Sequence, residues 1–368
     1  MKPASDKPAI LFFIQLPPPV HGVSIMNELL YSNQKINSEY RKYLLKLDFS
    51  KKFEDIRQLS LRKIIKSIWL VFKLSFKLIK VKPQLVYFSF MPVGIGFFRD
   101  ALYLLVIKCF KKKVLLHLDN RGILNHTNNK IRRWLYNITL RNTNIIHLSE
   151  KLVETELVPL KLRNLNYFVV PNAVKEVKYT YDNKQDKDIV DILFLSNLMP
   201  QKGIFIAIDI FKDLYEKHQH IRLHIIGQPV KRVPVRIPEK ISKNVVFHGA
   251  LFGYEKYKIL SNADIFIFPS FFGEECMPLS IIEAMQFELP VIATNNGAVN
   301  ELIQHNYNGY LPEIGEWDTF KTYLEKLIID SELRNKMGLK SRDIYEKKFT
   351  SAIFERNMLN VFNKLINV

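Results

Sequence analysis

The sequence has very little cysteine and no long hydrophobic run. Its 368 residues include only Cys109 and Cys276, which lie far apart, so neither a disulfide framework nor a cysteine-rich zinc site is expected. The apolar segment nearest the amino terminus, residues 10–14, is followed by Gln15 and then by three prolines. It is too short for a signal-peptide core or a membrane span. We therefore expect a cytoplasmic chain that does not cross a membrane.

Acidic residues are scarce in the first half of the chain. Residues 1–172 contain 29 Lys+Arg and 11 Asp+Glu, whereas residues 173–368 contain 25 of each, so the whole net charge of +18 lies in the first half. Halves that differ so much in charge predict two domains with different partners. The length agrees, because 368 residues exceed what one hydrophobic core usually serves.

The chain is organised around a strand–loop–helix–strand unit in residues 263–303. Residues 265–268 and 291–294 are apolar runs that predict buried strands, and residues 279–285 predict a short helix. The loop before the helix contains Glu275, and the helix itself contains Glu283. Loops at the carboxyl ends of strands in an open α/β sheet are where ligands bind, so both glutamates are candidates for chemistry.

Other apolar runs alternate with helical segments along the chain. Further strands are predicted at residues 9–14, 84–90, 113–118, 144–149, 167–170, 189–195, 222–227 and 245–251, and the final helices at 319–329, 332–347 and 351–366. This alternation predicts an α/β fold with parallel sheets. A polar linker at residues 175–187 places the domain boundary, giving domains 1–174 and 175–350 and a C-terminal helix in 351–368.

The unit around the glutamates resembles the donor-site signature of glycosyltransferase family 4. The resemblance rests on the two glutamates with seven residues between them, the following Ala284-Met285, the strand after Pro290, and the segment NGAVNE at residues 296–301. It implies the GT-B fold, in which two Rossmann-like domains face each other across a cleft and the C-terminal helix crosses back to the first domain. It also implies a retaining sugar transferase that uses a nucleotide-diphosphate sugar and needs no metal or other cofactor.

The resemblance implies roles for individual residues. Glu275 and His117 would be catalytic, with Glu275 stabilising the electron-poor sugar ring and His117 lying against the donor sugar. The residues expected to bind the donor are Gly22, Asn197, Lys202, Gly227, Met277, Pro278, Leu279 and Glu283. Alternatives stay open for single residues, since His117 could be a core histidine and the turn at Gly22 could bind nothing.

One departure from the family pattern affects the diphosphate site. Lys202 is in register with the family's lysine, which holds the diphosphate, but Asn197 stands where the family has arginine. Either Lys202 and the amides at helix starts suffice to neutralise the leaving phosphate, or Arg99 or Arg121 of the first domain supplies the missing cation.

Residues 61–80 predict a helix with its cations on one side. Arg62, Lys63, Lys66, Lys73, Lys77 and Lys80 fall within one roughly 100° sector, and the opposite side carries Leu61, Ile64, Ile68, Phe72 and Ile79. Such a helix either covers the sheet with its charges in solvent or lies on an anionic membrane surface. The membrane interpretation assigns Lys63, Lys66, Lys73 and Lys77 to the membrane and acceptor side.

The leading hypothesis is a cytoplasmic glycosyltransferase, peripherally bound to the inner face of the membrane, that adds a sugar to a lipid-linked acceptor of a cell-surface polysaccharide. One alternative is a GT-B nucleotide-sugar epimerase, which would form product without an acceptor. Another is a catalytically lapsed protein that docks on anionic lipid, which Asn197 favours. No nucleic-acid partner is expected, because the basic-plus-aromatic motifs of the known binding modules are missing.

Overall fold

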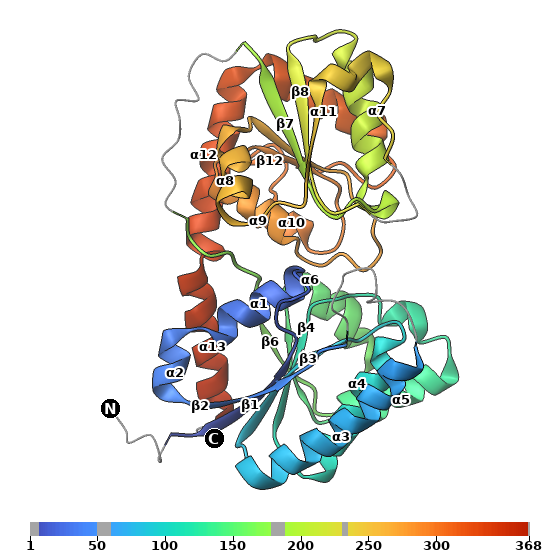
Figure 1. Cartoon of the computed structure of the whole chain (residues 1–368), viewed down its shortest axis with the longest axis vertical. Helices are drawn as coiled ribbons and strands as arrows, with labels where there is room; N and C mark the ends of the chain where they lie inside the picture. The colour runs from blue at the N-terminus through green and yellow to red at the C-terminus, as the bar shows by residue number, and fades with distance from the viewer. Residues whose placement is uncertain (1–6, 50–59, 178–187, 230–234, 367–368) are drawn as a thin grey trace. The chain divides into compact units, whose positions relative to one another are not determined.

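A computed structural model describes residues 7–49, 60–177, 188–229 and 235–366 of the chain (Figure 1). The chain divides into two compact units, which we call unit 1 (residues 1–172 and 351–368) and unit 2 (residues 173–350). The division falls two residues before the predicted boundary. Residues 178–187 of the predicted linker lie outside the described residues.

Unit 1 contains a six-stranded parallel sheet in the order β2-β1-β3-β4-β5-β6. Its strands are β1 (Ala9–Ile14), β2 (Arg41–Lys46), β3 (Leu85–Phe90), β4 (Val114–Leu118), β5 (Asn144–His147) and β6 (Asn166–Val169). The strands β1, β3 and β4 are buried along their whole length, which explains why continuous apolar runs predicted them. The edge strand β2 was not predicted, because it is only half-buried apart from Leu45.

Helices cover both faces of the unit 1 sheet (Figure 1). They are α1 (Gly22–Tyr31), α2 (Gln34–Glu39), α3 (Leu61–Val81), α4 (Gly96–Cys109), α5 (Lys130–Leu140), α6 (Glu150–Leu152) and α13 (Ser351–Ile366), with short turns at Leu124–His126, Val153–Leu157 and Val158–Leu160. The strand residues Leu11 and Phe13 share one core with the inner side of α3, α4 and α5. On the other face, Phe12 packs against Tyr31 of α1 and Phe362 of α13.

The packing of α3 corrects one expectation. Leu70, Leu74 and Leu78 are the α3 residues buried against the sheet. The predicted apolar side, Leu61, Ile64, Ile68, Phe72 and Ile79, is exposed instead. The helix therefore covers the sheet through the side that carries Leu70, Leu74 and Leu78. The sequence pattern did not identify this side, because apolar residues occupy most of the helix circumference outside the cationic sector.

The C-terminal helix α13 belongs to unit 1. Its Phe362 ring packs edge-on against Tyr40 and Tyr87, and the Tyr40 hydroxyl donates a hydrogen bond to the Asn363 side chain (2.6 Å). The Lys113 ammonium also donates to the Leu365 carbonyl. These contacts confirm that the last helix packs on the first domain.

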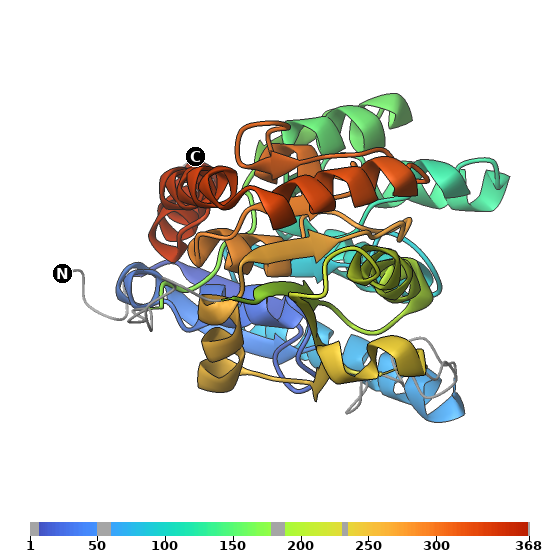
Figure 2. The ribbon, with the colours of Figure 1, turned by 90° about the horizontal axis from the view of Figure 1, so that it is seen from above.

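Unit 2 contains a second six-stranded parallel sheet, in the order β12-β11-β10-β7-β8-β9. Its strands are β7 (Val190–Leu195), β8 (Ile221–Ile226), β9 (Val245–Gly249), β10 (Ile265–Phe268), β11 (Val291–Ala293) and β12 (Gly309–Tyr310). Its helices are α7 (Ile204–Tyr215), α8 (Gly253–Asn262), α9 (Leu279–Gln286), α10 (Val299–Leu302), α11 (Trp317–Ile329) and α12 (Ser331–Lys348), with 3-10 turns η6 (Pro200–Lys202) and η7 (Glu239–Asn244). The helix α12 packs along α9 and β12 (Figures 1 and 2).

The two sheets confirm the α/β prediction. Among the described residues, no helix combines the length and the hydrophobicity that crossing a membrane requires.

Candidate functional site

The strand order of unit 2 creates a natural ligand site. The chain runs from β7 outward through β8 and β9 and then returns to β10, which pairs with the other edge of β7. The sequence order therefore reverses between β7 and β10. Ligands of open α/β sheets bind outside the carboxyl ends of the strands at such a reversal. The loops that follow β7 and β10 carry Lys202 and Glu275, respectively.

Lys202 and Glu275 are in direct contact. The Lys202 Nζ atom donates a hydrogen bond to Oε2 of Glu275 at 2.6 Å, and both side chains are largely buried. Gly203 brings the first loop close to the second, because its φ is +85° and an added Cβ would lie 2.1 Å from the Pro269 carbonyl oxygen. Only glycine fits such a position, so Gly203 allows the two loops to meet.

Neighbouring residues fix the Glu275 carboxylate. The Ser270 hydroxyl donates to the same oxygen, Oε2, at 2.9 Å. Asn296 in turn donates to the carbonyl oxygens of Ser270 and Phe272, both at 3.1 Å. Gly297 lies against the backbone of Glu275, where an added Cβ would be 2.3 Å from its carbonyl oxygen. These contacts hold the Glu275 side chain in one orientation. A group that acts on a bound ligand must be held in this way.

The Lys202 ammonium also lies over two aromatic rings. It is 4.7 Å from the ring centroid of Phe272 and 5.8 Å from that of Phe268. Cation–π contacts of this kind hold a cation in place while leaving its other donors available. The arrangement can accept an anion beside Lys202.

The helix α9 begins at Leu279, four residues after Glu275, and Met277 and Pro278 lead into it. Pro278 is the N-cap residue and makes no side-chain cap, so the first amides of α9 have no partner from it. Helix N-termini with uncapped amides attract anions. On the same helix, Glu283 accepts a hydrogen bond from Lys256 of α8 at 2.6 Å, and both side chains are mostly buried.

Gly227 has a packing role in unit 2. An added Cβ would lie 1.8 Å from the Ser196 carbonyl oxygen, and the Gly227 amide donates to the Gly249 carbonyl at 2.8 Å. The glycine thus keeps the loop after β8 close to the loop that carries Asn197. Asn197 itself is half-buried and lies in the loop that leads to Lys202.

In unit 1, His117 lies at the carboxyl end of β4. Its Nδ1 atom shares a hydrogen bond of 2.5 Å with the Tyr87 hydroxyl, and its Nε2 atom is 3.8 Å from Asp119 Oδ1. Burial lowers the pKa of His117, although the Asp119 carboxyl acts in the opposite direction, and burial raises the pKa of Asp119. Within the described residues, Nε2 has no hydrogen-bond partner, so His117 is not a fully satisfied core histidine.

Gly22 is the first residue of α1, which starts three residues earlier than predicted. His21 caps this helix: its Nδ1 accepts from the Ser24 amide, and the Ser24 hydroxyl accepts from the His21 amide. Burial lowers the pKa of His21 to about 4. Arg99, one candidate for the missing cation, is held within unit 1 by an ion pair of 2.6 Å with the buried Asp100.

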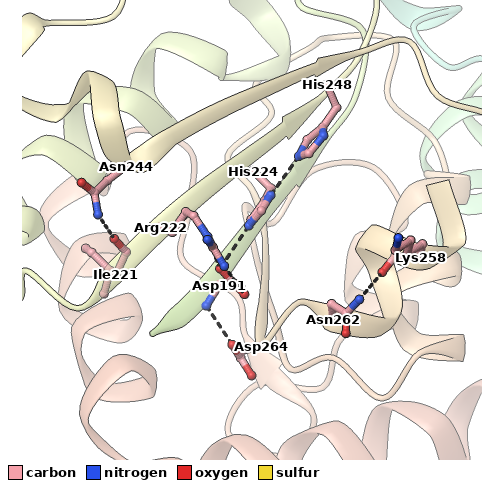
Figure 3. Close-up of polar contacts among 9 residues, drawn as sticks. All are labelled: Asp191, Ile221, Arg222, His224, Asn244, His248, Lys258, Asn262 and Asp264. Atoms are coloured by element: carbon pink, nitrogen blue, oxygen red, sulfur yellow. Dashed lines mark hydrogen bonds and ion pairs between the residues drawn. The ribbon is translucent and has the colours of Figure 1, made fainter. Parts of the chain in front are cut away.

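A second polar cluster lies elsewhere in unit 2 (Figure 3). Asp191, near the amino end of β7, pairs with Arg222 (2.7 Å) and His224 (3.0 Å), and the His224 ring stacks on His248. Together with neighbouring apolar residues, Asp191, Arg222 and His224 line an open cavity of about 390 Å³. The cluster is at the end of the sheet opposite to the loops that follow β7 and β10, and the sequence analysis did not single it out.

Sequence reasoning also missed several residues around the site. Ser270, Asn296 and Lys256 contact or position the two glutamates, and Tyr87 contacts His117. Ser270 and Asn296 follow directly after predicted strands, so their places at strand ends were a usable signal. Lys256 gave no such signal, because its contact with Glu283 depends on how α8 packs.

Comparison with known proteins bears on these loops. A family model described as glycosyl transferases, group 1, matches residues 179–343, which include Lys202, Glu275 and Glu283. This part of the chain, a little under half of its 368 residues, is similar to that family. The region matched lies entirely within unit 2.

A curated relative of the chain is also a glycosyltransferase. The chain is 26% identical over 241 residues to the capsular polysaccharide biosynthesis glycosyltransferase CapM of Staphylococcus aureus, covering 61% of this chain and 62% of that protein. The matched part spans about three-fifths of the length of this relative.

Solved structures show the fold of the whole chain. Sucrose-phosphate synthase from Thermosynechococcus elongatus superimposes with a TM-score of 0.77 at 14% identity, covering 98% of this chain and 99% of that one. HepE of Anabaena, in complex with UDP and glucose, gives a TM-score of 0.71 at 16% identity, with coverage of 97% and 99%. The predicted GT-B fold is confirmed.

Proposed function

We propose that this protein is a retaining glycosyltransferase that moves a sugar from a nucleoside-diphosphate sugar to an acceptor without a metal ion. The observation that carries the proposal is the contact of Lys202 with Glu275 where the sequence order of the unit 2 sheet reverses. A cation and a carboxylate side by side match the two charges that develop in sugar transfer, which are negative on the leaving phosphate and positive on the sugar ring.

We assign the leaving diphosphate to Lys202 and the first turn of α9. Lys202 has further donors beyond the one that Glu275 accepts, and the backbone N–H groups from Leu279 onward belong to a helix start without a side-chain cap. Met277 and Pro278 lead into this helix start, and Pro278 has no N–H of its own. Fixed donors of this kind stabilise developing negative charge without having to reorient. Asn197 and Gly227 belong to the same donor site in this proposal.

We assign the sugar and ribose to the two glutamates. Glu275, held by Ser270 and Lys202, would stabilise the electron-poor ring from a fixed position. Glu283 uses Oε1 for Lys256, which leaves its Oε2 atom to accept from ribose hydroxyls. The roles of Gly22 and His117 in the same reaction stay predictions, and the unpartnered His117 Nε2 is the observation in favour of the second.

Two similar proteins support a donor class and an acceptor class for this proposal. HepE is described in complex with UDP and glucose, which supports a UDP-hexose donor, and CapM acts in capsule biosynthesis, which supports a surface-polysaccharide acceptor. We propose that this acceptor is carried on lipid and that the enzyme acts in the cytoplasm at the inner membrane surface. No nucleic acid takes part in this proposal.

Calorimetry against a panel of nucleoside diphosphates tests the donor site. We expect binding of at least one diphosphate, and a loss of about tenfold or more in affinity for Lys202→Gln, because a charge-assisted contact to phosphate is removed. Lys240→Gln is the matched control, since Lys240 forms an exposed ion pair with Glu216 in the same unit. No binding by the wild type, or equal losses in both variants, would refute the proposal.

Acceptor dependence distinguishes transfer from epimerisation. With donor alone, a transferase gives at most slow hydrolysis, whereas an epimerase converts the donor to its isomer. Nuclear magnetic resonance of the sugar anomeric proton separates these results and reports retention in the transfer product. Conversion of the donor without acceptor would replace the proposed transferase with an epimerase.

A further inference from the structure

One side of α3 is apolar and exposed. Eight large apolar residues of this helix each keep between 50% and 73% of their surface exposed: Leu61, Ile64, Ile65, Ile68, Trp69, Phe72, Phe76 and Ile79. At about 100° per residue they fall in one sector of roughly 140°, directly beside the cationic sector and opposite the buried Leu70, Leu74 and Leu78. Monomeric proteins rarely leave so many neighbouring apolar side chains in water without a partner.

The neighbouring helices extend this apolar side. Helix α3 packs beside α4, and α4 beside α5, on one face of the unit 1 sheet (Figure 1). Their outward residues Ile95, Phe98 and Leu102, and Ile131, Trp134 and Ile138, are exposed as well. The guanidinium of the half-buried Arg132 of α5 lies 5.0 Å from the ring centroid of the exposed Phe98, so α5 contacts α4 at this surface. We call the exposed apolar residues of the three helices the α3–α5 surface.

The charge beside this surface is mostly positive among the described residues. Helices α3 and α5 contain no Asp or Glu, and the one acid of α4, Asp100, is fully buried against Arg99. On α3, Lys73 lies over the Trp69 ring and Lys80 over the Phe76 ring, at 5.4 and 5.7 Å from their centroids. Lys66 pairs with Asp48 at 3.4 Å. Apolar side chains bordered by lysines match an anionic lipid surface in both polarity and charge.

We propose that the α3–α5 surface binds anionic membranes, with the rings of Trp69, Phe72 and Phe76 inserting among the lipid tails and the lysines contacting the headgroups. The apolar side chains thus provide the insertion, and Lys63, Lys66, Lys73 and Lys77 provide the attraction to anionic headgroups. The proposal deepens the proposed function by giving the enzyme a route to a lipid-linked acceptor. It rests on the proposed function for that purpose only.

A bilayer fits the surface better than a second copy of the chain. In a two-fold symmetric dimer the same surface contacts itself, so the lysines and arginines of both copies would face each other with no acids on α3 or α5 to pair with. Anionic lipid headgroups supply the missing negative charge. Long lysine side chains at the border can extend to the headgroups while their stems stay with the apolar residues.

The three tryptophans of the chain test insertion directly. Trp69 and Trp134 belong to the α3–α5 surface, whereas Trp317 is a half-buried residue of unit 2. Three full-length proteins, each keeping one tryptophan with phenylalanine at the other two positions, are mixed with phosphatidylglycerol vesicles that carry brominated tails. We expect strong quenching for the Trp69 and Trp134 proteins and none for Trp317. Equal quenching in all three, or none for Trp69, would overturn the proposal.

A variant series separates insertion from self-association. Trp69→Ser, Phe72→Ser and Phe76→Ser combined should lower vesicle affinity about tenfold or more, because each ring loses its transfer into the lipid. The control is Ile329→Ser with Leu339→Ser, which replaces two equally exposed apolar residues of unit 2 and should leave affinity unchanged. Unchanged vesicle affinity in the triple variant, or a wild-type dimer that this variant dissociates, would refute membrane insertion. Circular dichroism checks that each variant is folded, and no nucleotide is present, so the result does not depend on the donor site.

Discussion

The Lys202 Nζ atom lies 2.6 Å from Oε2 of Glu275, a residue 73 positions later in the sequence. Both residues follow the carboxyl ends of neighbouring strands. The contact joins the loop after β7 to the loop after β10, and Ser270 shares the same carboxylate oxygen. A carboxylate held by two donors has little freedom to turn away from a ligand. This relationship makes Glu275 the residue whose substitution says most about the proposed chemistry.

Glu275→Gln should reduce sugar transfer strongly without unfolding the protein. The amide keeps an oxygen that can accept from Lys202 and Ser270, but it removes the negative charge that stabilises the sugar ring. We expect the transfer rate at saturating donor to fall about tenfold or more, because a charge-stabilising group contributes more than ~1 kcal/mol to the barrier. Glu274→Gln, the same change one residue earlier, should stay within about twofold. A rate for Glu275→Gln within about threefold of wild type would contradict the assignment.

Gly203→Ala should destabilise the protein more than Gly249→Ala does. Both glycines have positive φ, +85° and +69°, but an added Cβ at Gly203 would lie 2.1 Å from the Pro269 carbonyl oxygen, whereas nothing lies within 4 Å at Gly249. We expect a loss of about 1 kcal/mol at Gly249 from backbone strain alone, and about 2 to 4 kcal/mol at Gly203. Urea unfolding measures both. Equal losses would show that the close approach of the two loops is not what requires glycine.

His147 should make stability depend on pH. Burial lowers the pKa of His147, at the end of β5, to about 3, from an ordinary value of 6.5. The unfolded chain therefore binds more protons than the folded protein below pH 6.5, and the free energy of unfolding falls as the pH is lowered from 6.5 towards 3. The slope reaches about 1.4 kcal/mol per pH unit for this residue.

Urea unfolding at pH 7.5 and pH 5.5 measures this contribution. The loss of stability between these values should be about 1 kcal/mol smaller in His147→Gln than in the wild type, because glutamine does not titrate. The comparison is between two pH values of the same variant, so a general destabilisation by the substitution cancels. Identical losses in both proteins would refute the pH dependence assigned to His147.

The strands were predictable because most are buried on both faces. Runs such as residues 9–14 and 265–268 have no polar interruption and match β1 and β10 residue for residue. The edge strand β2 escaped prediction, because it has only three consecutive apolar residues, residues 43–45, with Arg41 and Lys42 before them and Lys46 after them. The sequence could not show which side of α3 packs on the sheet. Two sides of the helix are apolar, the buried one and the exposed one, and only the third carries the cations.

The side-chain contacts of the site could not be predicted from the sequence, for a different reason. Lys202 and Glu275 were each expected at the end of a strand, but their contact requires β7 and β10 to be neighbours. That pairing results from the chain returning across the sheet after β9, and no local pattern records it. The partner of Glu283, Lys256, likewise depends on how α8 lies against α9.

Asn197→Arg tests whether the diphosphate lies between the loop after β7 and α9. Asn197 is half-buried in the loop that carries Lys202, at the position where the family pattern has arginine. A guanidinium there can form two hydrogen bonds to phosphate, so we expect nucleoside-diphosphate affinity to rise about threefold to tenfold at low salt. Asn262→Arg adds the same charge to unit 2 beside the Asp191 cluster (Figure 3) and should leave affinity unchanged. If both variants gain the same affinity, the effect comes from the added overall charge, and raised salt would remove it in both. Asn197 would then not lie beside the phosphates.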